Sequence, residues 1–332
     1  MMRKTVRTVV VWGAIFASLL LTSQAFSQET LTVRVGMQAV GTFSWVVHAM
    51  EYFGIDDELG LNIEGITYAT KQATEIALRA GEVDVTVDDF VGVVLMRGRD
   101  IPVRAIYPYG KAVGGVVVPV DSDVQMLEDL QGKTIAAASL DDKSLLILRA
   151  LTSTQYGFDP QVDGETIAAG PWLMAGLMDD GEIDAGIPYW HFVARMTGTG
   201  RFRDVMMVTD MLDQLGLSSD LPILVVVGHE ATDPEVLTTF IKALQMTTAA
   251  MVADSDDGIW ASILENELYT LPDPSVFPEV RARWEAGLPE VWNQELIDGL
   301  VDLVEGLVEV AGAEVVGIER IDPEAFTTAY LP

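Results

Sequence analysis

Apolar and polar residues alternate along the chain in blocks that predict strands and helices in turn. Leu31–Met37 has the alternation of a strand, and residues 45–53 have the apolar spacing of a helix that ends at Gly54. Two more β-rich stretches, 61–68 and 83–87, lie on either side of a second helical segment. This alternation of strands and helices is typical of a parallel sheet with crossover helices.

A short phrase occurs twice in the chain, one hundred residues apart. Residues 81–84 read GEVD and residues 181–184 read GEID, each between a predicted helix and a predicted strand. We interpret each glycine as the left-handed end of a helix, a conformation that costs glycine little. In open α/β sheets, ligands bind beyond the carboxyl ends of the strands. The residues after the two strands, 88–89 and 189–191, should therefore lie at equivalent corners of two similar lobes.

The last part of the chain is mainly helical. A long helix is predicted over 233–253, with Asp233 as its N-cap and Pro234 in the first position. Further helical stretches follow around 257–267, 276–287 and 293–311.

No low-complexity linker divides the chain, so we expect two crossing strands, near 112–120 and 220–228, to join the lobes. The predicted domains are then a discontinuous lobe I over 29–115 plus 225–332, and a lobe II over 116–224.

The N-terminus has the pattern of a secretory signal peptide. Arg3, Lys4 and Arg7 precede an apolar run over 9–21, and small residues then offer a cleavage site after Ala25 or shortly beyond it. The alternative is an uncleaved membrane anchor, but the apolar run is short for a membrane span. We therefore expect residues 1–25 to be a signal peptide and the mature protein to lie in the periplasm.

The charge and the cysteine count narrow the function. Fifty acidic and 20 basic residues give a net charge of −30, and loss of the signal peptide would make it −33. A nucleic-acid binder needs a basic surface, so this class is excluded, and an anionic lipid surface is disfavoured. Because the chain has no cysteine, it has neither a disulfide nor a site for a lipid anchor. We expect a soluble monomer.

The order of the motifs resembles a known family. The signal peptide is followed by "VRVGMQ", "ALRAGEVDV", "LEDLQGKTIA", "LMDDGEIDAGIPYW" and "DPEVLTTFIKAL". This series is similar to periplasmic solute-binding proteins of ABC importers in the nitrate, sulfonate and taurine class, which also includes binders of thiamine pyrimidine precursors. The resemblance implies a two-lobed α/β structure, the type II periplasmic binding fold. Each lobe would be a mostly parallel sheet flanked by helices, with a two-strand hinge between the lobes.

The resemblance also implies a function. A small-molecule ligand would bind between the lobes, the lobes would close on it, and the closed form would dock on an ABC permease in the inner membrane. One departure concerns the ligand. Many relatives read Trp-Glu-Pro after the strand of the second lobe, where this chain has Pro188, Tyr189, Trp190 and His191. The ligand of a relative therefore does not transfer directly to this chain.

Aromatic and acidic residues at the predicted strand ends are the first candidates for ligand contact. Tyr189, Trp190 and Trp172 offer stacking faces of the kind that small-molecule clefts use; the alternative is that they only pack the second lobe. Asp88 and Asp89 are suited to an amine or a cationic ring nitrogen. The alternative for this acid pair is that it caps a helix that starts near residue 90.

The predicted strand–helix turns supply the other candidates. Free backbone N–H groups at a helix start suit an anion, which singles out Thr42, Phe43 and Trp45 in the first unit. The equivalent turn of the second unit contains Asp142, Lys143 and Ser144. Lys71 and Lys143 begin helices and would pair with a carboxylate or sulfonate if they are not simply solvated. His191 would donate to a ligand or serve as a hydrogen-bonded structural histidine.

Enzyme chemistry finds little support in the sequence. The three histidines lack the spacing of metal ligands, and no phosphate loop or dinucleotide motif occurs. The run 254–265 has an acid at each end like a calcium loop, but its glycine is misplaced and the run fits a helix start better. A related fold occurs in a yeast thiamine-pyrimidine synthase with a cysteine-rich motif, which this chain lacks.

We therefore expect a binding protein with no cofactor. The aromatic corner and the acid pair favour a sulfonate, amine or heteroaromatic ligand over a bare inorganic anion. A sensory or scavenging module of the same fold is the alternative, and a periplasmic enzyme is the third candidate.

Overall fold

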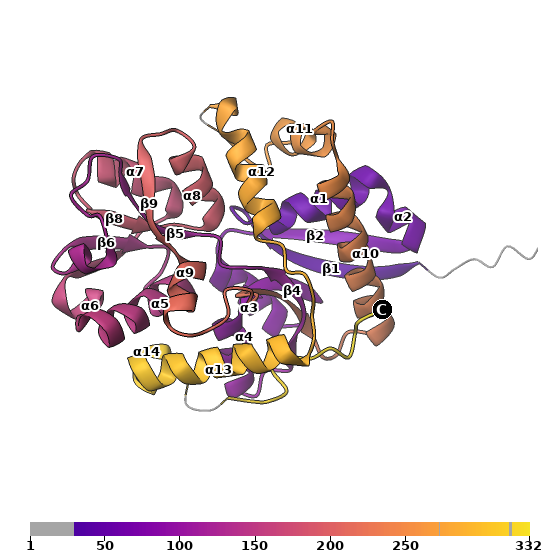
Figure 1. Ribbon diagram of the computed structural model, residues 1–332. Helices are drawn as coiled ribbons and strands as arrows, with labels where there is room; N and C mark the ends of the chain where they lie inside the picture. The colour runs from indigo at the N-terminus through magenta and orange to yellow at the C-terminus, as the bar shows by residue number, and fades with distance from the viewer. Residues whose placement is uncertain (1–29, 272, 319–320) are drawn as a thin grey trace, which may run out of the picture.

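Two five-stranded sheets, each flanked by helices, lie side by side in the computed structural model (Figure 1). The model describes residues 30–271, 273–318 and 321–332, so the predicted signal peptide lies outside the described residues. We call the first sheet with its flanking helices lobe I, and the second sheet with its helices lobe II. This arrangement confirms the predicted fold class.

The first sheet has the strand order β2-β1-β3-β10-β4. Its strands are β1 (Leu31–Gln38), β2 (Leu61–Tyr68), β3 (Val85–Asp89), β4 (Val103–Gly110) and β10 (Leu224–His229). β1 runs parallel to both β2 and β3, whereas β10 is antiparallel to β3 and β4. The strand that returns from the second half of the chain is thus placed inside the sheet and not at its edge.

The second sheet has the equivalent order β7-β6-β8-β5-β9. Its strands are β5 (Gly115–Pro119), β6 (Thr134–Ala137), β7 (Glu165–Ala168), β8 (Ala185–Ile187) and β9 (Phe202–Met207). β6 is parallel to β7 and β8, and β5 is antiparallel to β8 and β9. In both sheets the fourth strand is antiparallel and follows a chain crossing. The exact domain boundaries that we gave from the sequence stay a prediction.

The helices fall into two sets. Those beside the first sheet are α1 (Phe43–Phe53), α2 (Ile55–Leu59), α3 (Lys71–Arg79), α4 (Phe90–Gly98), α10 (Pro234–Ala253), α11 (Gly258–Glu265) and α12 (Phe277–Ala286). Those beside the second sheet are α5 (Lys143–Leu151), α6 (Pro160–Asp163), α7 (Pro171–Asp179), α8 (Trp190–Thr197) and α9 (Val208–Gln214). The C-terminal region adds α13 (Gln294–Ala311) and α14 (Ala313–Val316).

The doubled phrase forms the same joint in each lobe. Gly81 and Gly181 follow α3 and α7 with φ angles of 67° and 69°, in the left-handed region that favours glycine. This confirms the conformation that the sequence predicted for both glycines.

The aspartate of each phrase fastens two neighbouring strands. Asp84 N–H donates to the Arg34 carbonyl, and an Asp84 carboxylate oxygen accepts from Arg34 N–H, both at 2.8 Å. Asp184 and Thr134 repeat both bonds at the same two distances. The repeated phrase thus forms the same strand-to-strand connection in both sheets.

α10 is long and apolar enough, by length and composition alone, to cross a membrane. Its apolar face, however, packs against α1 and β1, and Leu237, Phe240, Ile241 and Leu244 are buried there. This is the packing of a core helix. Asp233 accepts a hydrogen bond from Glu235 N–H and Pro234 takes the first position, which confirms the predicted helix start.

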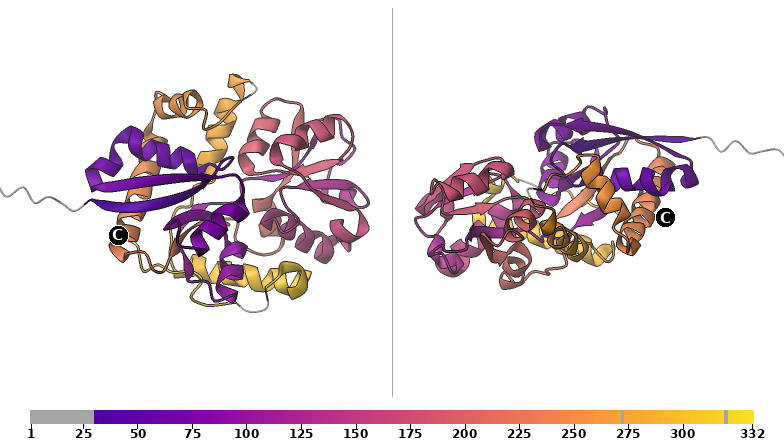
Figure 2. Two further views of the ribbon diagram at one scale, coloured as in Figure 1. Left: turned by 180° about the vertical axis from the view of Figure 1, so that it is seen from behind. Right: turned by 90° about the horizontal axis from the view of Figure 1, so that it is seen from above.

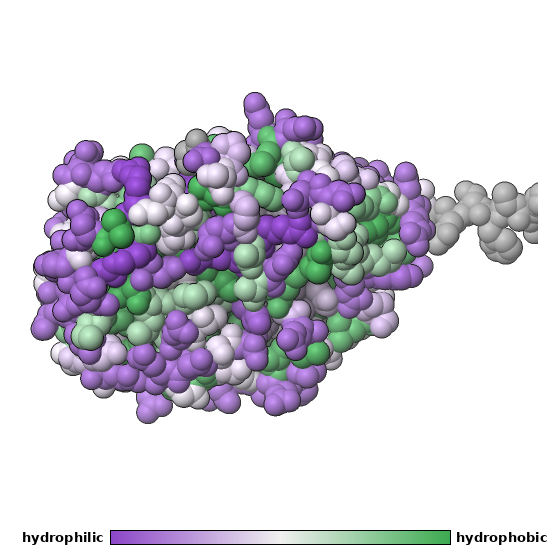
Figure 3. Space-filling view, turned by 45° about the horizontal axis from the view of Figure 1, so that its top comes forward, coloured by the Kyte–Doolittle hydropathy of each residue, from purple (hydrophilic) through white to green (hydrophobic). Residues whose placement is uncertain are grey.

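α13 extends below both lobes (Figures 1 and 2). Its apolar residues Leu300, Leu303 and Leu307 belong to a core that also contains residues of α4 in lobe I and α5 in lobe II. The two lobes therefore share part of one hydrophobic core. On the face shown in Figure 3, polar side chains cover most of the surface and apolar residues form small patches between them.

Some elements differ from the sequence prediction. The helix that was expected to begin at Lys143 is α5; it ends at Leu151 and continues as a π-helical turn, η2 (Thr152–Tyr156), before Gly157. Two short 3₁₀ turns, η1 (Leu127–Leu130) and η3 (Pro274–Val276), complete the structure. β9, α8 and α9 were not predicted. Asp88 and Asp89 are the last residues of β3 and do not lie in the loop beyond it.

Candidate ligand-binding site

A cavity of about 240 Å³ lies between the two sheets and is lined by residues of both. The ends of β1 and β3 contribute from lobe I, together with the starts of α1 and α3. From lobe II come the starts of α5, α7 and α8, which follow β6, β7 and β8. The carboxyl ends of parallel strands thus face each other across the cavity, as expected for a ligand site in α/β proteins.

The candidate residues gather at this cavity, with one exception. Those that line it are Thr42, Phe43, Lys71, Asp88, Asp89, Asp142, Lys143, Ser144, Trp172, Tyr189, Trp190 and His191. This is a statement about position, and contact with a ligand stays a prediction for each of them.

Trp45 does not line the cavity, which corrects its place in the candidate site. The side chain is 1% exposed and packs in the core of lobe I, with its ring centroid 4.8 Å from that of Tyr269. Its indole N–H donates to the Leu268 carbonyl at 3.2 Å. As the third residue of α1, Trp45 points to the buried side of the helix and not past its N-terminus. It supports Trp190 from behind, at 6.0 Å between ring centroids.

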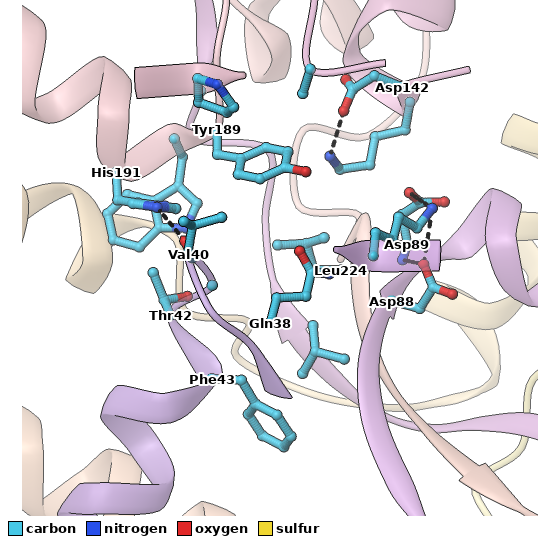
Figure 4. Close-up of a pocket in the computed structure, with 18 of the residues that line it drawn as sticks. Gln38, Val40, Thr42, Phe43, Asp88, Asp89, Asp142, Tyr189, His191 and Leu224 are labelled. Atoms are coloured by element: carbon cyan, nitrogen blue, oxygen red, sulfur yellow. Dashed lines mark hydrogen bonds and ion pairs between the residues drawn. The ribbon is translucent and has the colours of Figure 1, made fainter. Parts of the chain in front are cut away.

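The aromatic wall belongs to lobe II. Tyr189 precedes α8 and extends its ring into the cavity (Figure 4). Burial raises the pKa of the Tyr189 hydroxyl, so it stays protonated and can donate a hydrogen bond. Trp172 is 59% exposed and lies at the rim, where its ring covers the backbone of Gly170. The wall therefore offers one enclosed ring and one ring that is open to solvent.

His191 joins the two lobes. Its Nε2 and the Val40 carbonyl oxygen are 2.9 Å apart, with the N–H donating (Figure 4). Tyr269 of lobe I donates its hydroxyl hydrogen to the His191 carbonyl at 2.7 Å. Burial lowers the pKa of His191 to about 3, so the ring is neutral. The one N–H of the neutral ring is bonded to Val40, as expected for a structural histidine, whereas Nδ1 is buried with no partner among the described residues. Contact of His191 with a ligand stays a prediction.

The acid pair is already bound to a lysine of the protein. Lys71 Nζ lies 2.7 Å from Asp89 Oδ2 and 3.0 Å from Asp88 Oδ1. Burial opposes the charge on Lys71, but Asp88, Asp89 and Glu75 raise its pKa well above the usual value. Asp89 also caps α4 by accepting from Gly92 N–H at 2.8 Å. An ammonium group of the protein therefore already lies where the amine of a ligand would pair with these acids, and their contact with a ligand stays a prediction.

Lys143 is a second buried cation, and its ion pair is longer than those that Lys71 forms with Asp88 and Asp89. Its Nζ lies 3.5 Å from Asp142 Oδ2 and 5.9 Å from the centre of the Tyr189 ring. Burial lowers its pKa, but Asp142 and Asp89 outweigh this and raise the pKa above the usual value. Asp142 also caps α5 by accepting from Ser144 N–H at 2.8 Å. A buried ammonium with one long ion pair retains hydrogen-bond donors for a ligand.

Backbone N–H groups add to this positive character. α1, α7 and α8 all begin at the cavity, and within the described residues none of them has a capping side chain. Uncapped helix starts carry partial positive charge and orphan donors, which suit an anion.

Gln38 is a lining residue that the sequence analysis missed. It is the last residue of β1, and its side-chain amide points into the cavity (Figure 4). The rule that selected Asp88 and Asp89, a polar residue at the carboxyl end of a strand, would have selected Gln38 as well. Across the described part of the chain, no cluster of three or more His, Cys, Asp or Glu residues could hold a metal ion.

Comparison with known proteins agrees with this fold. The structure is similar to that of the alkanesulfonate-binding protein SsuA from Xanthomonas axonopodis pv. citri bound to MOPS. The TM-score is 0.70 at 14% identity, with 90% of this chain and 99% of that chain covered. It is also similar to the periplasmic aliphatic sulphonate binding protein SsuA from Escherichia coli, with a TM-score of 0.64 at 17% identity and coverage of 88% and 95%.

A third similar structure is the CA3427 gene product of Candida albicans, which is described as having the generic periplasmic binding protein structural fold. Here the TM-score is 0.64 at 13% identity, with 91% of this chain and 97% of that chain covered. These likenesses confirm the predicted fold. A search of curated proteins gives no match. The family model described as NMT1/THI5 like matches residues 50–257, more than half of the chain, and the protein therefore belongs to the NMT1/THI5-like family.

Proposed function

We propose that this protein is the periplasmic solute-binding component of an ABC importer and that it captures a small organic anion between its lobes. The family and the fold support a binding protein. Two of the similar structures are named as sulfonate-binding proteins, and one of them holds MOPS. The proposal includes docking of the closed form on a permease of the inner membrane.

The observation that carries the proposal is Lys143, a buried cation at the cavity whose one carboxylate partner among the described residues is 3.5 Å away. The Tyr189 hydroxyl and the uncapped start of α8 lie on the same side. The opposite acid pair is neutralised in part by Lys71. An anion therefore gains charge-assisted hydrogen bonds from Lys143, whereas an amine would have to compete with Lys71 and Lys143 for the carboxylates.

The size of the cavity and its wall define the rest of the ligand. About 240 Å³ lies below the range of roughly 300–1,000 Å³ that is usual for drug-sized ligands. The Tyr189 ring offers an apolar face beside the cation. We therefore propose a monoanion such as a sulfonate or carboxylate with a short apolar or aromatic group.

Closure follows from the position of the cavity. Because its lining comes from both sheets, a ligand gains its full set of contacts only when the lobes are together. Such a ligand shifts the population towards the closed form.

Ligand screening tests the proposal. Binding to the native state raises the melting temperature, so the mature protein is screened against sulfonates, carboxylates, amines, pyrimidines and inorganic nitrate. We expect organic monoanions to give the largest shifts. If only amines or pyrimidines give a shift, the anion assignment is wrong although solute binding stands. If no small molecule gives a shift, the whole proposal fails.

Two lysine variants then locate the anion. Loss of a charge-assisted hydrogen bond costs about 1.5–3 kcal/mol, so Lys143→Met should weaken the binding of the best anion about 10- to 100-fold by calorimetry. Lys242→Met, on the exposed side of α10, is the matched control and should leave affinity unchanged. Equal effects of the two variants would remove Lys143 from the site. Stimulation of a reconstituted permease ATPase by the loaded protein would test the importer.

A further inference from the structure

One ammonium group and three carboxylates form a cluster at the wall of the cavity. Lys71 Nζ lies 2.7 Å from Asp89, 3.0 Å from Asp88 and 3.4 Å from Glu75. Asp88 and Asp89 are 3% and 5% exposed. With every group ionised, one positive charge would face three negative charges in a poorly solvated place, which is costly. A cluster of this composition is stabilised by binding one proton.

The hydrogen bonds indicate where that proton goes. Asp89 uses both oxygens, one for Lys71 and one for Gly92 N–H, and these contacts favour its ionised form. Asp88 Oδ1 accepts from Asp89 N–H and faces Lys71, but Asp88 Oδ2 is buried with no partner among the described residues. Because no group donates a hydrogen bond to this buried oxygen, a negative charge on Asp88 is poorly stabilised. Asp88 is therefore the carboxyl of the cluster that is protonated most easily.

Charged groups on the other neighbouring elements are few. α3 contributes Lys71 and Glu75, and β10 places the apolar Val225 opposite Asp88. From lobe II, Lys143 of α5 acts on Asp89 and is itself paired with Asp142. Tyr189 also faces this group of charges. The pKa of Asp88 is raised to about 7, mainly by burial and also by the neighbouring Asp89 and Glu75, whereas Lys71 acts in the opposite direction.

We propose that the cluster of Lys71, Glu75, Asp88 and Asp89 takes up a proton when an organic anion enters the cavity, and that Asp88 receives it. The inference rests on the proposed function. An anion beside Lys71 and Lys143 adds negative charge and competes for the ammonium that Asp88 shares, so it favours the protonated carboxyl. By linkage, the protonated protein binds the anion more tightly. Capture is therefore strongest on the acid side of neutrality.

The test measures protons and affinity together. Ethanesulfonate, benzenesulfonate and benzoate are added to the mature protein in weakly buffered potassium chloride while a pH electrode follows proton uptake. Sulfonate buffers are avoided because they resemble the proposed ligand. We expect uptake approaching one proton per bound anion at about pH 8. The affinity should fall with rising pH above neutrality, by at most about tenfold per pH unit for one proton.

Two variants assign the proton. Asp88→Asn keeps the shape of the side chain but cannot titrate, so proton uptake and the pH dependence should both disappear. Glu75→Gln removes one negative neighbour from a partly exposed position and should move the pH dependence to lower pH. Thermal unfolding checks that both variants fold, and Glu75→Gln alone suffices if Asp88→Asn does not.

Each outcome has one meaning. Anion binding with a flat affinity from pH 6 to pH 9 and no proton uptake overturns this inference while the proposed function stands. Proton uptake that persists in Asp88→Asn also overturns it. If none of the three anions binds, the anion assignment fails and this inference fails with it.

Discussion

The two aspartates of the doubled phrase offer a matched pair of mutations. The Asp84 carboxylate accepts from Arg34 through its backbone N–H at 2.8 Å, its Nε at 3.0 Å and its Nη2 at 2.6 Å, and from the Thr232 hydroxyl at 3.2 Å. The Asp184 carboxylate accepts from Thr134 N–H at 2.8 Å, and its other neighbour, Lys133 Nζ, is 3.8 Å away. The side chains are 10% and 40% exposed.

These differences set the size of the expected effects. A hydrogen bond to a charged group contributes about 1.5–3 kcal/mol, but several bonds to one carboxylate are not additive. The Arg34 side chain is 39% exposed, so water can hydrate it when the carboxylate is removed. We expect Asp84→Ala to lower the free energy of unfolding by about 3 kcal/mol. For Asp184→Ala, which removes one backbone bond at a more exposed place, we expect about 1 kcal/mol.

Urea unfolding, followed by circular dichroism, measures both variants. Burial alone would raise the pKa of Asp84, but the hydrogen bonds from Arg34 outweigh burial and lower it. The stabilisation is thus fully present above the unfolded pKa of about 3.9 and is lost as the pH falls through the lower folded value. The deficit of Asp84→Ala should shrink below pH 4. Equal losses for the two variants would refute the reasoning.

Glycine and histidine variants give further tests. Gly81→Ala and Gly181→Ala place a side chain in a left-handed conformation and should each lower the free energy of unfolding by about 1 kcal/mol. Gly176→Ala lies inside α7, where a side chain has open space, and should raise the free energy of unfolding by about 0.5–1 kcal/mol. Melting temperatures that do not separate these two groups would contradict this. His191 is neutral in the fold, with a pKa of about 3, but is protonated in the unfolded chain below about pH 6.5. Stability should therefore fall between pH 6.5 and pH 3, and His191→Gln should flatten this limb; an unchanged limb would show that other groups cause it.

The sequence was a good guide to the parallel parts of the fold. β1 and β2 have clear alternation, and the α3 and α7 helices end at glycines that only a left-handed turn explains. β9 was missed because it is an edge strand whose side chains are mostly half-buried, so its alternation is weak. The position of β10 between β3 and β4 is set by long-range pairing, which a local pattern does not contain.

The candidate site was predicted by position better than by chemistry. The strand-end rule found most of the lining, because strand ends and helix starts meet at one edge of each sheet. It misplaced Trp45 because the third residue of α1 turns its side chain to the buried side of the helix, away from the helix start. It also gave no sign that Lys71, from a different element, forms ion pairs with both Asp88 and Asp89. Contacts between elements decide whether a carboxylate is open to a ligand, and they appear only in the folded structure.

The place of β10 has a consequence for the order of folding. The whole of the second sheet lies between β4 and β10 in the sequence, yet β10 separates β3 from β4 in the first sheet. A chain that is synthesised from its N-terminus therefore has β3 and β4 without the strand between them until residue 229 has followed. The first sheet is completed only after all strands of the second sheet have been made, so the order of the strands ties the folding of lobe I to the synthesis of lobe II.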